Sequence, residues 1–174
     1  MAEAEVGPPG AVENPWAGLI VSGPGQVFKV DTGRTDKPGA VSLTWLTVRT
    51  PEEGVRFSQY TQEKVVPALA RLPGFLSFTG GGIGAWQFTL TMWASMEAVG
   101  EMQGLQSHRE AVKWFFRPGP DGIASAGLTG VWGVERLNTL WVRCTGCDNM
   151  VDADAPGALC TVCGVHLPDH TPYW

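Results

Sequence analysis

All four cysteines of this 174-residue chain lie near its C-terminus, in two Cys-x-x-Cys pairs with twelve residues between them. The pairs are Cys144 with Cys147 and Cys160 with Cys163. Each pair can wrap one side of a metal ion, and four thiolates complete a tetrahedral shell. A closed shell leaves no position for a reacting water, so we expect a structural zinc ion rather than a catalytic one.

Other chemistry is open to the same four residues. A rubredoxin-like site holds iron with four cysteines, so the ligand set does not by itself separate iron from zinc. A redox dithiol or disulfides are further alternatives. Twelve residues between the pairs are too few to bury a core without metal, which favours a metal-held zinc ribbon. His166 and His170 follow closely, but the cysteines already fill the shell.

His108 is the only histidine before the tail. Imidazole titrates near neutral pH, and when partly desolvated it can act as a general acid or base or as a haem ligand. The alternative is a solvated helix histidine beside Arg109 and Glu110. Six aromatic residues of the middle region more often form a core than line a substrate pocket. They are Trp86, Phe88, Trp93, Trp114, Phe115 and Phe116.

The elements that must position these side chains begin with a strand at 41–50, rich in β-branched and aromatic residues. A helix follows, with Thr50 as N-cap, Pro51 at the first helical position and Glu53 completing a capping box. We expect Pro67 to kink this helix and the Pro-Gly pair at 73–74 to end it.

A hairpin follows, with its turn expected in the glycine-rich stretch 80–84. In its second strand, Trp86, Phe88, Leu90 and Met92 alternate with polar residues, which is typical of a half-buried strand. Ser95 can cap a second helix, with a break near 104–106, and a last strand is expected at 128–137. Strand, helix, strand, strand, helix, strand is the order of a ferredoxin-like α+β domain, written βαββαβ.

The sequence therefore divides into an N-terminal extension (1–40), a ferredoxin-like domain (41–138) and a zinc-ribbon tail (139–174). Residues 1–15 lack periodicity and are expected to be disordered or loosely attached. Two short strands at 19–21 and 27–30 are expected to form a hairpin. Helices on one side of the sheet leave its other face needing cover. We expect a homodimer that packs sheet against sheet through residues such as Trp45, Phe78 and Phe88.

The segments "LPGF", "TLTMW" followed by Ala-Ser, and "SHREAVKWF" occur in this order within 41–137. This region resembles the dimeric α+β barrel superfamily of antibiotic-biosynthesis-monooxygenase-like domains, and within it the spheroidene-monooxygenase-like proteins. The resemblance implies oxidation of a phenolic or polyketide substrate without a cofactor, haem binding or degradation, or dimer packing alone. His108 matches the proximal histidine of haem-binding relatives relative to Trp93, which makes both candidate haem-pocket residues. The strand at 41–50 has no asparagine, which departs from the haem-degrading pattern.

Composition narrows the functional classes. The net charge is −5 with no basic cluster, which argues against nucleic-acid binding. No apolar run approaches a membrane span and no signal peptide is legible, so we expect a cytoplasmic protein. The leading hypothesis is a monooxygenase-like enzyme for a small aromatic or polyketide-like molecule. The alternatives are a non-catalytic module that binds a protein through the ribbon, and a haem-binding protein.

Overall fold

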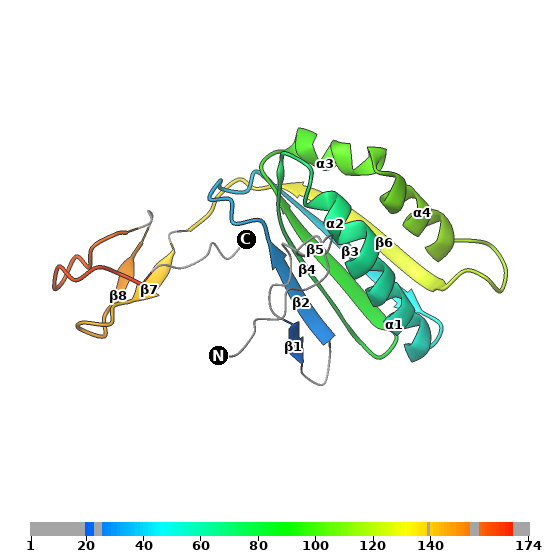
Figure 1. Ribbon diagram of the computed structural model, residues 1–174, viewed down its shortest axis with the longest axis horizontal. Helices are drawn as coiled ribbons and strands as arrows, with labels where there is room; N and C mark the ends of the chain where they lie inside the picture. Colours follow the sequence, from blue (N-terminus) through cyan, green and yellow to red (C-terminus); the bar gives the residue numbers. More distant parts are fainter. Residues whose placement is uncertain (1–19, 23–25, 139, 154–156, 169–174) are drawn as a thin grey trace, which may run out of the picture.

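The computed structural model of the chain describes residues 20–22, 26–138, 140–153 and 157–168. Figure 1 shows a sheet with its helices on one side, followed by a small C-terminal lobe. The segment 1–15, expected to be disordered or loosely attached, lies outside the described residues. Among the helices of the described part, none has the length and apolar composition needed to cross a membrane.

Six antiparallel strands form one sheet in the order β1-β2-β4-β5-β3-β6. They are β1 (Ile20–Ser22), β2 (Gln26–Asp31), β3 (Ala40–Val48), β4 (Phe75–Ile83), β5 (Trp86–Trp93) and β6 (Ala124–Gly133). The first and third strands of the βαββαβ unit, β3 and β5, lie at the centre, as a ferredoxin-like fold requires. The predicted fold class is therefore confirmed, and the predicted N-terminal hairpin, β1 with β2, lengthens the sheet beyond β4.

One face of the sheet carries the helices α1 (Pro51–Tyr60), α2 (Val66–Leu69), α3 (Met96–Gly104) and α4 (Gln106–Phe115) (Figure 1). The capping box is confirmed: the Glu53 amide donates to Thr50 Oγ1 at 3.3 Å, and the Thr50 amide donates to Glu53 Oε2 at 3.2 Å. Ser95 caps α3 through the Ala98 amide. Leu105, with ψ of 129°, makes the predicted break between α3 and α4.

Pro67 disturbs the first helix in a different form from the predicted kink. The five residues Thr61–Val65, immediately before α2, form a π-helical turn in which the Val66 amide donates to the carbonyl of Thr61. Proline has no amide hydrogen and its ring crowds the preceding turn. A wider turn just before Pro67 accommodates both effects, so the helix continues instead of ending.

Two predicted boundaries in the sheet are wrong. The β4–β5 turn is at Gly84 and Ala85, and Gly80 and Gly82 lie within β4. A Cβ at Gly82 would meet the side chain of Gln87, so glycine is needed there for packing rather than for the turn. The last strand starts at Ala124, four residues earlier than predicted, because it pairs with β3 along almost its whole length.

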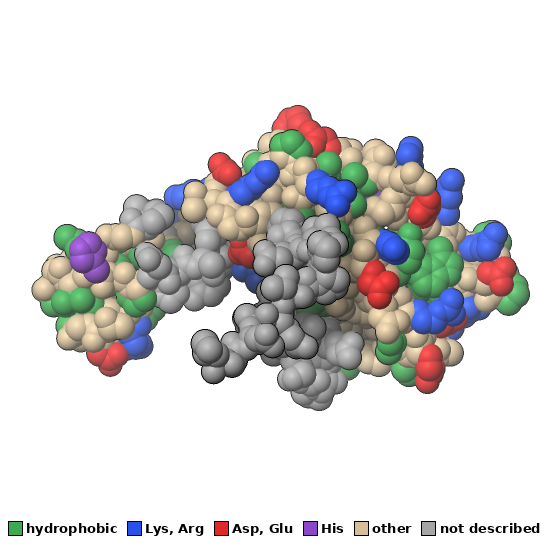
Figure 2. Space-filling model, in the orientation of Figure 1, with side chains coloured by type: hydrophobic (Ala, Val, Ile, Leu, Met, Phe, Trp, Pro, Cys, Tyr) green, Lys and Arg blue, Asp and Glu red, His purple; other side chains and the backbone are tan. Residues whose placement is uncertain are grey.

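The chain has two separate apolar cores. The larger lies between the sheet and the helices, and its most buried large side chains include Trp93, Phe75, Phe78 and Leu69. The smaller holds the tail together around Val142, Val151 and Leu167 with the sulfur ligands. The tail strands are β7 (Trp141–Arg143) and β8 (Met150–Asp152). On the face in Figure 2, acidic and basic side chains are interspersed over the main body without a patch of one sign.

Substitution of Gly74, just before β4, tests how closely α3 packs against this part of the chain. A Cβ at this position would overlap the Cβ of Ala98, which is buried in α3. We expect Gly74→Ala to lower the free energy of unfolding by about 1–3 kcal/mol because the helix must shift. Gly100→Ala is the matched control, since Gly100 is an exposed position of α3 with no atom within 4 Å of the added Cβ. It should stabilise the fold by roughly 0.5–1 kcal/mol. Equal thermal unfolding temperatures for the two variants would contradict this packing.

Candidate metal centre and ligand-binding face

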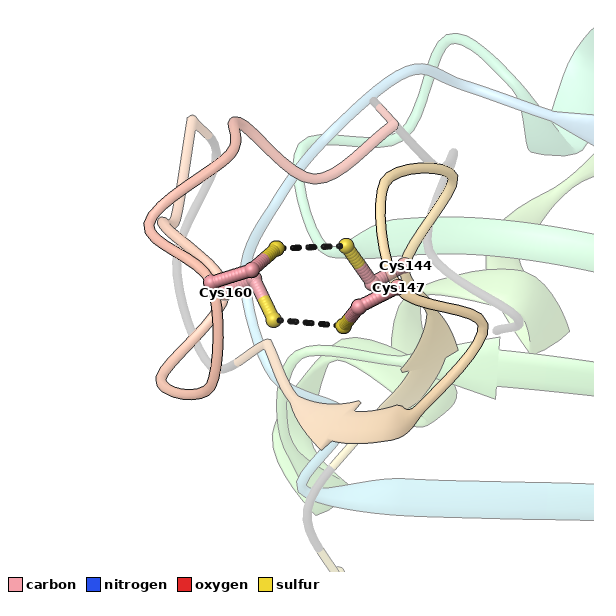
Figure 3. Close-up of side chains that lie close together, drawn as sticks. Cys144, Cys147 and Cys160 are labelled. Atoms are coloured by element: carbon pink, nitrogen blue, oxygen red, sulfur yellow. Dashed lines mark hydrogen bonds between the residues drawn. The ribbon is translucent and has the colours of Figure 1, made fainter.

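The four cysteines of the tail converge on one point. Their Sγ atoms all lie within 4.8 Å of one another. The Sγ of Cys144 is 3.6 Å from that of Cys163, and the Sγ of Cys147 is 3.6 Å from that of Cys160 (Figure 3). A disulfide would need about 2.05 Å, so these are not bonded pairs. The predicted four-cysteine cluster is confirmed.

The spacing of the sulfurs fits a tetrahedral ion. With metal–sulfur bonds of about 2.3 Å, the edges of a tetrahedron are about 3.8 Å, close to the two distances between the pairs. Each of these distances joins one Cys-x-x-Cys pair to the other, so an ion would bridge the two halves of the tail. We call each pair, with the turn that holds it, a knuckle. His166 is exposed and does not belong to the cluster, while His170 lies outside the described residues.

The first knuckle is built by backbone hydrogen bonds around Cys144. The Cys144 amide donates to the carbonyl of Asn149, and the Cys144 carbonyl accepts from the amide of Asp148, both at 2.9 Å. The Gly146 amide points at the Cys144 sulfur at 3.3 Å. Asp148, directly after Cys147, has φ of 60°, a left-handed conformation that aspartate tolerates better than most residues. This turn directs both sulfurs to the same side.

The second knuckle repeats the first. The Cys160 amide donates to the Val165 carbonyl at 2.8 Å, and its carbonyl accepts from the Gly164 amide at 2.9 Å. Gly164, with φ of 74°, takes the position that Asp148 has in the first knuckle. The Val162 amide points at the Cys160 sulfur at 3.4 Å. Two turns of the same geometry facing each other are a metal-binding arrangement of the zinc-ribbon type.

The four thiols do not ionise equally. Hydrogen bonds from Asn149 lower the pKa of Cys147 to about 6. The Val165 amide favours the Cys163 thiolate, but desolvation and the three other thiols raise the pKa of Cys163 to about 12. A cation among the four sulfurs would stabilise their thiolate forms, Cys163 included, so the donor set suits a metal ion.

The helix-covered face of the sheet has a polar centre. The alternation in β3 places Ser42 and Thr44 on the same side as Leu46 and Val48, which belong to the core under the helices. The register places Thr91 beside Ser42, and both Thr89 and Thr129 beside Thr44. We call these five residues the hydroxyl patch: Ser42, Thr44, Thr89, Thr91 and Thr129.

Exposure rises across the hydroxyl patch toward the β6 edge. Ser42 and Thr91 are buried, Thr44 and Thr89 are half-buried, and Thr129 is exposed. The hydroxyls of Thr44 and Thr129 lie 2.9 Å apart and are hydrogen-bonded. Because Thr129 lies on the helix side and is still exposed, the helices leave this part of β6 uncovered and the patch reaches solvent there.

The opposite face of the same strands is apolar, and we call it the apolar face. It consists of Val41, Leu43, Trp45, Trp86, Phe88, Leu90, Met92, Leu128 and Trp132. Trp86, Leu128 and Trp132 are 65%, 67% and 53% exposed. The rings of Trp45 and Phe88 are in contact, with centroids 5.8 Å apart. No charged residue occurs in β3, β5 or β6.

The alternation predicted for β5 is present, and Trp45 and Phe88 lie on the uncovered face, as predicted. The predicted position of Phe78 on the uncovered face is wrong: it pairs with Thr91 on the helix side and is 2% exposed. An irregularity between Phe75 and Ser77 shifts the register there, so positions counted by simple alternation change faces. The hydroxyl patch was missed, although the serine and threonines at every second position of β3 and β5 carried the signal.

His108 lies one turn before Ala111 and two turns before Phe115 on α4, and both of these are buried. Phe115 packs on Phe57 of α1, with ring centroids 4.6 Å apart. His108 is half-buried, and burial lowers its pKa from the usual 6.5. The side chain is therefore on the core-facing side of the helix and neutral at pH 7, whereas Arg109 and Glu110 are exposed.

Trp93, the other predicted pocket residue, is fully buried. Its ring meets Phe75 edge-on with centroids 5.3 Å apart, and its indole N–H donates to Thr91 Oγ1 at 2.7 Å. Thr91 in turn is 3.4 Å from the carbonyl of Ser42. Trp93 therefore exposes no surface to a ligand, and its indole N–H orients the Thr91 hydroxyl of the patch.

Neither a protein-family model nor a curated protein matches the sequence. Among solved structures, the chain is similar to a protein of Lactobacillus acidophilus assigned as a monooxygenase, with a TM-score of 0.48 and 15% identity. The match covers 62% of this chain and 48% of that one, so the chain spans about half of its length.

Two further structures show a similar likeness. A monooxygenase of Streptomyces coelicolor in complex with nanaomycin D has a TM-score of 0.47 and 17% identity, over 58% of this chain and 91% of that one. A heme-degrading enzyme of Listeria monocytogenes has a TM-score of 0.47 and 13% identity, over 65% of this chain and 73% of that one. At this level of similarity, the fold is assigned from the strand order, and activity does not follow.

Cys147→Ser tests the metal centre. Wild-type protein should hold about one metal ion per chain, because four thiolates form one closed shell. The serine variant should lose most of it and unfold the tail, while the sheet and its helices keep their melting transition because the two cores are separate. Elemental analysis and two-probe thermal unfolding measure both effects. Thr145→Ser, an exposed position within the same knuckle, is the control. Metal-free wild type with an unchanged, folded tail would contradict the prediction.

Proposed function

We propose that residues 41–138 form a monooxygenase-like enzyme that binds a small aromatic molecule between the hydroxyl patch and α4. The tail is then a structural zinc ribbon. The observation that supports this most is the polar centre of the helix-covered face. Burying hydroxyls under helices costs free energy unless they gain partners, and a protein that needed only a stable core would fill this position with apolar side chains.

The surroundings of the patch suit an aromatic ligand. Phe116 is 51% exposed and its ring lies over Gly127, where a Cβ would collide with it. At the other end of the patch the buried rings of Phe28 and Phe78 stack with centroids 5.1 Å apart and crowd Gly80, which closes that end. Apolar walls around a few polar groups are the usual composition of small-molecule sites.

The reaction class follows from the resemblance of 41–137 to antibiotic-biosynthesis-monooxygenase-like domains. In a cofactor-independent reaction the substrate itself supplies the electrons. An anthrone shows the balance: its CH₂ becomes C=O, one oxygen atom of O₂ enters the product, and the other leaves with the two hydrogens as water. His108 would remove the first proton, for which its neutral form is required. Burial keeps it in that form at neutral pH.

Zinc is the ion we propose for the ribbon, because a closed tetrahedral four-sulfur shell is the commonest structural zinc site. The tail also supports the second candidate function, a docking module for a protein. Among its described residues, the exposed large apolar ones are Trp141, Met150, Leu159, Val162 and Val165. Haem binding by His108 is a third candidate, and a Soret band in protein incubated with haem would favour it.

The apolar face supports a homodimer. Exposed aromatic and aliphatic side chains over three uncharged strands exceed what monomers usually leave in water. A second copy packed on the same face would bury them in a twofold interface, and a stable interface of this kind needs about 800 Å² per partner. The assembly would leave the helices, and with them the proposed ligand site, on the outside.

Oxygen uptake with an anthrone tests the proposed enzyme. Wild type should consume one O₂ per anthraquinone formed, and His108→Ala should slow this by roughly 10²–10⁴-fold, the usual contribution of general acid–base catalysis. Arg109→Ala is the control, because Arg109 is exposed beside it. Since the pKa of His108 is lowered from 6.5, the rate should hold below pH 6.5 and fall only as the pH drops through the lowered value. Equal rates for wild type and His108→Ala would exclude His108 as the base.

Light scattering tests the dimer. Wild type should have the mass of two chains at micromolar concentration. Leu128→Arg, in the middle of the exposed part of the apolar face, should give a monomer because it would bury an unpaired charge in the interface. Val55→Arg is the control: Val55 is 48% exposed but lies on α1, on the other side of the molecule. A monomeric wild type, or a dimer unaffected by Leu128→Arg, would rule out this interface.

A further inference from the structure

The hydroxyl patch forms two adjacent rows that run across the strands. One row is Thr89, Thr44 and Thr129, and the next contains Thr91 and Ser42. The first row continues through Gly80 to Phe28. A ligand lying along these rows would cross strands about 5 Å apart, and would meet the hydroxyl oxygens of Thr44 and Thr129 together, since these lie 2.9 Å apart.

Each hydroxyl can donate one hydrogen bond and accept others. In the pair of Thr44 and Thr129, one hydroxyl uses its hydrogen on the other, and the second keeps its hydrogen for another partner. Thr91 already accepts from the Trp93 indole, which fixes its position. The exposed pair is therefore the part of the patch that can receive a ligand group.

Charge limits what that group can be. The two rows contain no lysine, arginine or histidine on β3, β5 or β6. A carboxylate or phosphate taken from water into this patch would lose solvation without gaining a cation, which is unfavourable. A neutral hydroxyl or carbonyl group loses much less solvation free energy on entering the patch. It can also replace its hydrogen bonds to water with hydrogen bonds to the threonines.

We propose that the Thr44–Thr129 pair recognises a neutral, oxygen-bearing edge of an aromatic ligand, a phenolic hydroxyl or a ring carbonyl, and so sets the substrate class. The inference rests on the proposed function for where the ligand binds, and it does not depend on the proposed reaction. The exposed ring of Phe116, which lies over Gly127, holds the flat body of the ligand, and the threonines select its polar edge. Anionic aromatics, including haem through its two carboxylates, are poor ligands for this pair.

Calorimetric titration with two matched probes tests the inference. The probes are 2-naphthol, which has a hydrogen to donate, and 2-methoxynaphthalene, which does not. Wild type should bind 2-naphthol about tenfold more tightly, the effect of one to two hydrogen bonds. Thr44→Val with Thr129→Val should remove that preference, because valine keeps the shape of threonine but has no hydroxyl to accept the hydrogen bond of 2-naphthol. The control is Thr47→Val, on the same strand but on the apolar face, which should keep the full preference.

Each outcome is decisive. A preference that survives in the double valine variant, or that is absent in wild type, overturns the inference and leaves the proposed enzyme standing. Failure of wild type to bind either probe overturns both the inference and the proposed ligand site. A preference that depends on Thr44 and Thr129, in a protein that consumes no oxygen with anthrones, supports the inference and rejects the proposed reaction. Circular dichroism of the double variant verifies that the fold is intact.

Discussion

The constraint on which this structure depends is the unequal polarity of the two faces of its sheet. The strands β3, β5 and β6 carry hydroxyls toward the helices and large apolar side chains away from them. In most sheets with helices on one side the apolar side chains face the helices. A shift of one residue in the register would restore that arrangement, so the observed register must be held by other interactions. The fully buried Trp93, Phe75 and Leu46 provide them at the ends of the strands.

This arrangement would link the proposed ligand site to the proposed dimer. Hydroxyls on the helix-covered face reduce the apolar surface that the sheet can bury against its helices. A second copy on the apolar face would add hydrophobic stabilisation on the other side of the same strands. The dimer would in this way offset the cost of the site. The tail is independent of both, because its small core is organised around four sulfurs and shares no residue with the main core.

Local chemistry was sufficient to predict many features from sequence. The capping box at Thr50, the cap at Ser95 and the break at Leu105 depend on neighbouring residues, and all are present. The ferredoxin-like strand order followed from the succession of elements, and the cysteine cluster followed from ligand spacing. A period of two is the same for both faces of a strand, so alternation alone did not show which face is covered. The expected sheet-to-sheet packing placed Trp45 and Phe88 on the uncovered face correctly. Phe78 and the glycines of β4 were misplaced because a register irregularity and side-chain packing, rather than local preference, determine their positions.

The most direct test of whether the unequal faces lead a second copy to cover the apolar one is hydroxyl-radical footprinting of the tryptophans in solution. Trp86 and Trp132 of the apolar face and Trp141 of the tail are 65%, 53% and 57% exposed in a single chain, so a monomer would oxidise all three at comparable rates. If a second copy covers the apolar face, Trp86 and Trp132 should be protected at micromolar concentration and become reactive on dilution, while Trp141 stays reactive throughout. Equal oxidation of the three residues at every concentration would contradict the account.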